Sequence, residues 1–344
     1  MSKKEPMFSL NILMIGTRAT GKTTYLTCTY GKSSEDALFD DGKCKVTLDL
    51  AENSSYVSQT NSEKIKRYWR DLHKGESSIM GTQMERFQYP FIMKYQNKAI
   101  FSGDTHPLPL LKLNWTDARG GSFDALTLDD ANGKRFLLDA LKNDIKNKTY
   151  TAIMVFCKWE DVLFERTQTD GKNEIDRLEF VSIIKSIVEL KSTYPRLPVV
   201  LIITHGAEEI ADEKRLRERS EEVKEHTNRL YERKDKVRNV LDRIANDFGK
   251  ASLNFPVFFV DSVMNAKFSP YMVEYVGLDE VRKPMISILG QCAEIITDVI
   301  EKAERRPKSR GIIAREKIKK LFVRPESERL VEAFRKAKAI MGMV

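Results

Sequence analysis

Short apolar runs and longer amphipathic stretches alternate along most of the chain. The apolar or alternating runs predict β-strands at residues 8–15, 45–49, 86–96, 110–115, 151–156, 199–204 and 256–260. Apolar residues at helical spacing predict helices at residues 62–74, 132–147, 176–194 and 284–303. Residues 24–30 are too few for a full helix before Gly31, and residues 31–43 are expected to form a polar loop. Strands that alternate with helices predict an α/β fold with a mostly parallel sheet flanked by helices.

A long helical insertion is expected between the last two predicted strands, at residues 208–250. Residues 207–248 contain no Gly or Pro and are dense in charges of both signs. A single helix of this length would extend ~60 Å, and a bent pair of helices fits the pattern equally well. A thin apolar seam predicts either coiled-coil-like contact or one buried stripe on a solvated insertion. Its residues are Val223, Leu230, Val237, Leu241 and Ile244.

The net charge of +8 resides in the C-terminal part of the chain. Residues 301–344 carry 14 Lys and Arg against 6 Glu, and the preceding 300 residues carry 44 charges of each sign. We therefore expect a domain at residues 1–303 followed by a basic amphipathic helical tail at residues 304–344. Such a tail can dock on a protein partner, an anionic membrane or nucleic acid, or pack back on its own domain. A protein partner or self-packing is the first expectation.

Cysteine usage and hydropathy suggest where the chain resides. The four cysteines are scattered without a CxxC pair, a pattern typical of reduced, cytosolic thiols rather than a disulfide framework or a zinc site. No run of about 18 apolar residues occurs, so no transmembrane segment is expected. These features predict a cytoplasmic protein.

The motif that carries chemistry follows the first predicted strand. Residues 16–23 match GxxxxGK[ST], a pattern whose backbone N–H groups cradle phosphates at the start of a helix. Lys22 is expected to contact the β- and γ-phosphates, and the Thr23 hydroxyl is expected to be a ligand of Mg²⁺. The other expected phosphate-binding residues are Gly16, Thr17, Arg18, Ala19, Thr20, Gly21 and Thr24. The strand before and the helix after meet the context that this motif requires.

A second motif ends the strand predicted at residues 110–115. Asp117-Ala-Arg-Gly120 is similar to the DxxG segment that phosphate-sensing GTPases place opposite their phosphate loop. This resemblance implies that Asp117 contacts Mg²⁺ through water and that the Gly120 N–H meets the γ-phosphate. An ordinary turn is the alternative. The same resemblance implies a Thr that closes over the metal, for which Thr82 is the candidate and Thr47 its rival; a solvated loop hydroxyl is the alternative for Thr82.

The ends of the last two predicted strands resemble base-binding segments. Thr204-His-Gly occupies the place of the [NT]KxD motif, with His205 for the Lys and Ala207 for the guanine-reading Asp. This Thr-His-Gly motif is similar to that of immune-associated and chloroplast-import GTPases. The resemblance implies that His205 stacks on a purine and that Glu208 accepts a hydrogen bond from its amine. Ser262 resembles the SAK-type loop on the other side of the base. A purely structural role for His205 remains open.

Residues 8–262 as a whole resemble a divergent P-loop GTPase of the Ras-related class. No Gln follows DxxG, since Gly121 stands there, so Arg119, Arg18 or a partner's arginine would have to compensate. The resemblance therefore implies GTP or GDP and Mg²⁺ as cofactors, with ATP left open, and slow or partner-stimulated hydrolysis.

Four functions fit these features. The first is a switch that regulates a protein partner through its Thr82 and Asp117 segments, the insertion or the tail. The second is a nucleotide-binding scaffold with little turnover. The third is an ATP-binding protein that engages nucleic acid through the tail. The fourth is a P-loop kinase with residues 212–243 as a lid, against which DxxG argues.

Overall fold

The structure of the chain is a computed structural model. It describes residues 8–17, 19–40, 44–51, 56–74, 86–97, 108–118, 150–162, 171–204, 220–247, 255–260 and 281–292. Among these residues, no helix combines the length and the apolar character that crossing a membrane requires.

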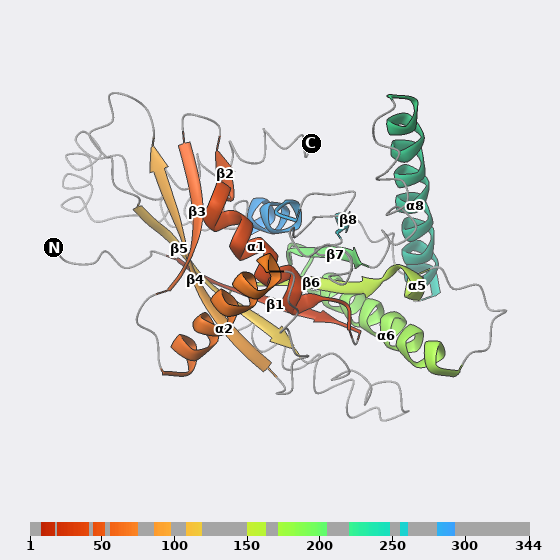
Figure 1. Cartoon of the computed structure of the whole chain (residues 1–344). Coiled ribbons are helices and arrows are strands. Elements are labelled where there is room, and N and C mark those ends of the chain that lie inside the picture. Colours follow the sequence, from red (N-terminus) through yellow and green to blue (C-terminus); the bar gives the residue numbers. More distant parts are fainter. Residues whose placement is uncertain are drawn as a thin grey trace, which may run out of the picture.

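The described strands form one eight-stranded sheet in the order β2-β3-β4-β5-β1-β6-β7-β8 (Figure 1). The strands are β1 (Phe8–Gly16), β2 (Phe39–Asp40), β3 (Cys44–Leu50), β4 (Arg86–Asn97), β5 (Leu108–Ala118), β6 (Tyr150–Lys158), β7 (Val199–Thr204) and β8 (Val257–Phe259). The five strands from β5 to β8 in this order are mutually parallel. β2, β3 and β4 extend the sheet beyond β5 by antiparallel pairing. The predicted α/β fold with a mostly parallel sheet is confirmed.

Helices cover both faces of this sheet. The helices are α1 (Lys22–Asp36), α2 (Tyr56–His73), α5 (Trp159–Val162), α6 (Gly171–Thr193), α8 (Ser220–Asp247) and a helix at residues 283–292. β1 feeds both cores, because successive side chains of a strand point to opposite faces. Its Ile12 and Met14 join the cluster under α1, α2 and residues 283–292. Its Leu13 and Ile15 join the cluster under α5, α6 and α8.

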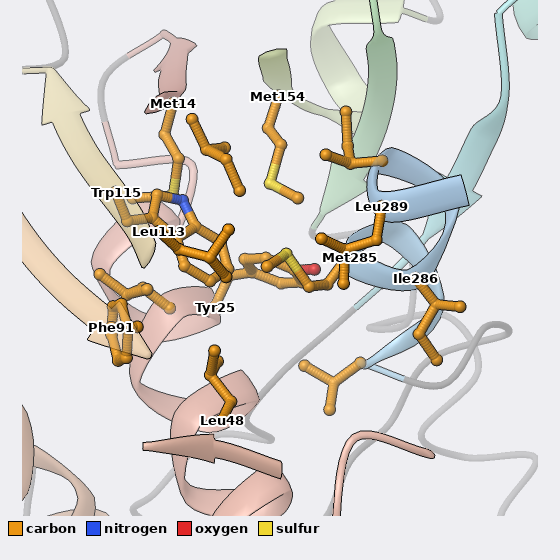
Figure 2. Packing of buried hydrophobic residues seen from close by; sticks show 14 of the residues in the cluster. Met14, Tyr25, Leu48, Phe91, Leu113, Trp115, Met154, Met285, Ile286 and Leu289 are labelled. Atoms are coloured by element: carbon orange, nitrogen blue, oxygen red, sulfur yellow. The ribbon is translucent and has the colours of Figure 1, made fainter. Parts of the chain in front are cut away.

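Aromatic side chains hold α1 against the sheet. Tyr25 meets Trp115 and Phe156 edge to face, with ring centroids 6.2 Å and 5.3 Å away. Figure 2 shows Tyr25 between Trp115 and the side chains of residues 283–292, among them Met285. Edge-to-face pairs add about 0.5–1.5 kcal/mol each beyond the apolar area that they bury. The helix that follows the GxxxxGKT segment is therefore fixed firmly to the strands beneath it.

The prediction for the segment after that motif was wrong. α1 continues through Gly31 to Asp36, and β2 follows at residues 39–40, so residues 31–43 are not one polar loop. Gly31 does not end the helix; it makes room for a neighbour. A Cβ atom placed on Gly31 would lie 2.0 Å from the ring of Trp69 on α2. Helix packing therefore overrides the low helix propensity of glycine.

The other predicted elements that fall on described residues are confirmed. The seven predicted strands correspond to β1, β3, β4, β5, β6, β7 and β8, and the helices predicted at 62–74 and 176–194 correspond to α2 and α6. Residues 283–292 form part of the helix predicted at 284–303. α8 is one continuous helix of 28 residues, which decides for a single helix at residues 220–247. The helix predicted at 132–147 and the tail at 304–344 lie outside the described residues.

α8 packs on the rest of the structure through one stripe of apolar side chains, which belong to the apolar seam predicted from the sequence. Val237, Leu241 and Ile244 are buried against α6 and the sheet. The side chains of Val223 and Leu230 lie outside the described residues. Figure 1 shows the N-terminal part of α8 extending away from the sheet, while its C-terminal part lies beside α5.

We predict opposite effects of alanine at two helical glycines, Gly31 and Gly290. Gly31→Ala should lower the free energy of unfolding by about 1–3 kcal/mol, because its methyl group would overlap the Trp69 ring. Gly290→Ala is the matched control. Its methyl group would meet no atom within 4 Å. It should stabilise the protein by about 0.5–1 kcal/mol through helix propensity. Urea denaturation measures both, and equal effects would contradict this packing.

Candidate functional site

The candidate site lies at the carboxyl end of β1, where the chain places β5 on one side of β1 and the later strands β6, β7 and β8 on the other. β1 lies between β5 and β6, and both neighbours run parallel to it. Ligands of open α/β sheets bind outside the carboxyl ends of the strands at such a point. Register brings Met14 level with Asp117 of β5, and Gly16 level with Phe156 of β6. The GxxxxGKT segment therefore begins at this edge of the sheet, and Asp117 lies beside it.

The backbone of the GxxxxGKT loop depends on its two glycines for different reasons. Gly16 passes so close to β6 that an added Cβ would lie 2.2 Å from the Phe156 carbonyl oxygen. Gly21 has φ 72°, in the left-handed region, although a Cβ there would meet no atom within 4 Å. Ala19 is also left-handed, with φ 54°. Bends with left-handed residues make concavities lined by N–H groups, which bind anions.

The Lys22 side chain lies inside this bend. Its ammonium donates to the carbonyl oxygens of Gly16 at 3.3 Å and Thr17 at 3.1 Å, and to the Thr20 hydroxyl oxygen at 3.4 Å. Lys22 is only 7% exposed, and both threonines are fully buried. Lys22 also begins α1, whose N-terminus has no capping side chain and no acidic residue in its first turn. A buried cation and a helix N-terminus therefore coincide within the loop.

Thr23 and Asp117 meet although 94 residues separate them. The Thr23 hydroxyl donates to Asp117 Oδ2 at 2.5 Å, and Asp117 is fully buried. The two residues that the sequence assigned to one metal ion thus lie in direct contact. Tyr89 of β4 lies close to the same carboxylate. Burial raises the pKa of the Tyr89 phenol, and its electrostatic interactions with the Asp117 carboxylate and with Tyr68 raise it further.

Asp161 is a site residue that the sequence did not reveal. Its Oδ2 accepts hydrogen bonds from the Thr17 hydroxyl at 3.0 Å and from the Lys158 N–H at 3.2 Å. Asp161 follows β6 on the short helix α5 and is 7% exposed. A carboxylate three residues beyond a buried strand was the available signal. Its importance depends on β6 being the neighbour of β1, which only the sheet order gives.

The remaining expected site residues divide into two groups. Thr204 ends β7, and its buried hydroxyl donates to the Cys157 carbonyl oxygen at 3.3 Å. Thr24, on the first turn of α1, is half-buried. Seven candidates lie outside the described residues: Arg18, Thr82, Arg119, Gly120, His205, Glu208 and Ser262.

Thr47, the rival metal ligand, lies at the wrong end of the sheet. It pairs with Lys94 of β4, and Lys94 pairs with Pro109 of β5. Asp117 lies eight residues further along β5, which corresponds to about 26 Å at 3.3 Å per residue. Thr47 therefore cannot share a metal ion with Thr23 and Asp117. Within the described ranges, no group of three or more His, Cys, Asp or Glu side chains could hold a metal ion by itself.

Three buried cysteines complete the surroundings. Cys28, Cys157 and Cys292 are free thiols, and burial raises the pKa of each. Each is therefore a small core side chain rather than a reactive thiolate.

Comparison of the sequence with known proteins gives no family. No protein-family model matches the chain, and the search of curated proteins found no significant match.

We predict that Tyr89 makes the protein sensitive to alkaline pH. Because the phenol has a higher pKa in the folded than in the unfolded chain, its contribution to stability is complete below pH about 10 and decreases as the pH rises above that value. Tyr89→Phe should therefore reduce the loss of unfolding free energy between neutral and strongly alkaline pH. Urea denaturation across this range measures the loss, and the same loss in both proteins would contradict the expectation.

Proposed function

We propose that this protein binds a guanine nucleotide and Mg²⁺ in the loop between β1 and α1, and acts as a switch with slow or partner-stimulated GTP hydrolysis. The observation that supports it best is the 2.5 Å hydrogen bond from Thr23 to Asp117, beside the buried Lys22. Two motifs that are unrelated in sequence thus converge on one edge of the sheet. A P-loop NTPase fold of the Ras-like class, with the insertion at α8, is part of this proposal.

The loop has the chemistry that a polyphosphate needs. Lys22 supplies a cation, and the α1 N-terminus supplies the positive end of a helix dipole. Left-handed residues such as Ala19 and Gly21 are typical of bends whose N–H groups bind anions. The Lys22 ammonium now contacts oxygens of Gly16, Thr17 and Thr20. A phosphate that enters the bend would offer this ammonium charged oxygens in place of neutral ones, and charge-assisted hydrogen bonds are about twice as strong.

Thr23 and Asp117 fit a magnesium ion. Mg²⁺ prefers oxygen ligands and is usually held by one or two protein groups together with water and substrate phosphates. The Thr23 hydroxyl and the Asp117 carboxylate supply two oxygens next to the loop. Bound Mg²⁺ would neutralise phosphate charge there. Thr82, expected to close over the metal, remains a prediction.

The segment after β5 is the proposed switch. Asp117 is the penultimate residue of β5, so the DxxG motif begins at the carboxyl end of this strand, beside the loop. A contact between the Gly120 N–H and a γ-phosphate would order this segment, and hydrolysis would release it. The base would lie beyond β7 and β8, where Thr204 ends its strand and where His205, Glu208 and Ser262 follow in the sequence. Ala207 in place of an Asp leaves ATP open as the nucleotide.

A scaffold with little turnover is the second candidate. Gly121 stands where a Gln would orient the attacking water, so hydrolysis would depend on Arg119, Arg18 or a partner's arginine. The proposed partner is a protein, bound through the switch segments, α8 or the tail. Nucleic acid and anionic membranes are alternatives that concern only the basic residues 304–344, and a cytoplasmic location remains a prediction.

We predict that the purified protein carries nucleotide in a manner that depends on Lys22. Denaturing the protein and separating the released nucleotides should yield GDP or GTP from the wild type and at least tenfold less from Lys22→Ala, because the variant loses the buried cation. Lys32→Ala is the matched control. It removes a lysine from the same helix, but one that pairs with Asp36 at the surface.

The outcomes distinguish the candidates. Guanine nucleotide that is lost only in Lys22→Ala supports the switch, and single-turnover hydrolysis then separates a slow GTPase from a scaffold. Adenine nucleotide would remove the switch. If the wild type bound neither guanine nor adenine nucleotide, even when the nucleotide and Mg²⁺ were added at millimolar concentration, the nucleotide site itself would be contradicted.

A further inference from the structure

The short helix α5 contacts the GxxxxGKT loop through a buried carboxylate. Asp161 Oδ2 accepts a hydrogen bond from the Thr17 hydroxyl at 3.0 Å. The same oxygen accepts the Lys158 N–H at 3.2 Å, which fixes the carboxylate at the end of β6. Thr17 is the first residue after Gly16 and also provides a carbonyl oxygen to Lys22. Asp161 therefore controls the orientation of the residue on which the bend of the loop begins.

Two residues earlier, α5 contacts α8. Trp159 is 5% exposed, and the Arg233 guanidinium carbon lies 5.3 Å from the centre of its ring. Phe259 of β8 meets the same ring edge to face at 5.5 Å. A guanidinium over an indole ring is attractive, and more so where water is excluded. Figure 1 shows α5 beside the C-terminal part of α8.

Arg233 belongs to the buried stripe of α8. It lies four residues before Val237 and eight before Leu241, so all three side chains share one face of the helix. Val237 and Leu241 are buried in the core shared with α6, and Arg233 continues this face to Trp159. The seating of α8 on the domain and the position of Trp159 are thus mechanically connected.

We infer that Asp161 is a positioning residue of the phosphate loop and that α5, which carries it, couples nucleotide binding to the seating of α8. This inference rests on the proposed function. When α8 is seated, Arg233 and Phe259 hold Trp159, α5 is fixed, and Asp161 holds Thr17 in the bend that receives phosphate. Nucleotide in the loop in turn favours the seated position of α8, because coupling between two sites is reciprocal.

The coupling assigns a role to the insertion. α8 contacts the domain along one stripe and leaves its other faces to solvent, as the exposed Glu232, Asp235 and Arg238 show. A protein that binds α8 would change the affinity for nucleotide without contacting the nucleotide. Conversely, loss of nucleotide would loosen α8.

The test compares Arg233→Leu with Arg238→Leu. Arg238 is on the same helix, its side chain is 71% exposed, and it faces Asp235 at 4.0 Å. Arg233→Leu should raise the dissociation constant for Mg-GDP about fivefold or more, the lower end of typical coupling between sites. Arg238→Leu should leave it unchanged. Arg233→Lys keeps a cation near the ring and should recover part of the affinity.

The reciprocal measurement uses hydrogen exchange of residues 220–247. Mg-GDP should slow exchange in α8 of the wild type and of Arg238→Leu. In Asp161→Asn, saturating Mg-GDP should slow it much less, because the neutral amide holds Thr17 less firmly. If Asp161→Asn does not fold, as judged by circular dichroism, the Arg233 and Arg238 pair decides alone.

The two failures are distinguishable. Suppose that the wild type binds nucleotide in a Lys22-dependent manner, but that Arg233→Leu binds it as tightly as Arg238→Leu and that nucleotide does not change hydrogen exchange in α8. The coupling is then wrong, and the proposed function stands. If the wild type binds no nucleotide, both are overturned.

Discussion

The site depends on how tightly β1 is confined between β5 and β6. β1 pairs with a parallel neighbour on each side, and its interior side chains fill both cores. At its end, Gly16 approaches the Phe156 carbonyl oxygen too closely for any side chain. This position therefore requires glycine, and α1 begins six residues later, at Lys22. The same confinement sets the carboxyl ends of β5 and β6 on either side of the turn, which brings Asp117 and Asp161 to it.

Three buried charges gather around this turn. Lys22, Asp117 and Asp161 are each at most 7% exposed, and each has hydroxyl or backbone partners. Burying charge is costly unless partners compensate, and such groups cluster where a protein binds or reacts. Two carboxylates and one ammonium leave one negative charge in excess. A divalent cation at Thr23 and Asp117 would offset it, which agrees with the proposed role of Mg²⁺.

Much of this arrangement could be predicted from local sequence, and the misses have physical causes. The buried strands were predictable because a parallel strand covered on both faces reads as a continuous apolar run, as in Val199–Thr204. Glycine at position 31 was misleading because its helix-breaking tendency is local, whereas the Trp69 ring that needs its space comes from another helix. β2 has only two residues, too few for a periodic signal. Asp161 was missed because its partner Thr17 lies 144 residues away.

The candidate site was predictable to the extent that one motif contained it. Lys22 and Thr23 are neighbours in sequence, and the GxxxxGKT pattern predicts the roles proposed for both. Asp117 lies near Thr23 because β5 is a neighbour of β1 in the sheet. The position of DxxG at the end of a predicted strand suggested this proximity. The residues proposed to bind the base rest on resemblance alone, since their motif departs from the usual one at Ala207.

The most direct test of a phosphate site between β1 and α1 is a crystal structure of the protein with Mg²⁺ and a non-hydrolysable GTP analogue. This account predicts that the β- and γ-phosphates lie within the bend at residues 16–23, with the Lys22 ammonium on their oxygens and the metal ion beside Thr23 and Asp117. A nucleotide bound elsewhere, with Lys22 still on the carbonyl oxygens of Gly16 and Thr17, would contradict it.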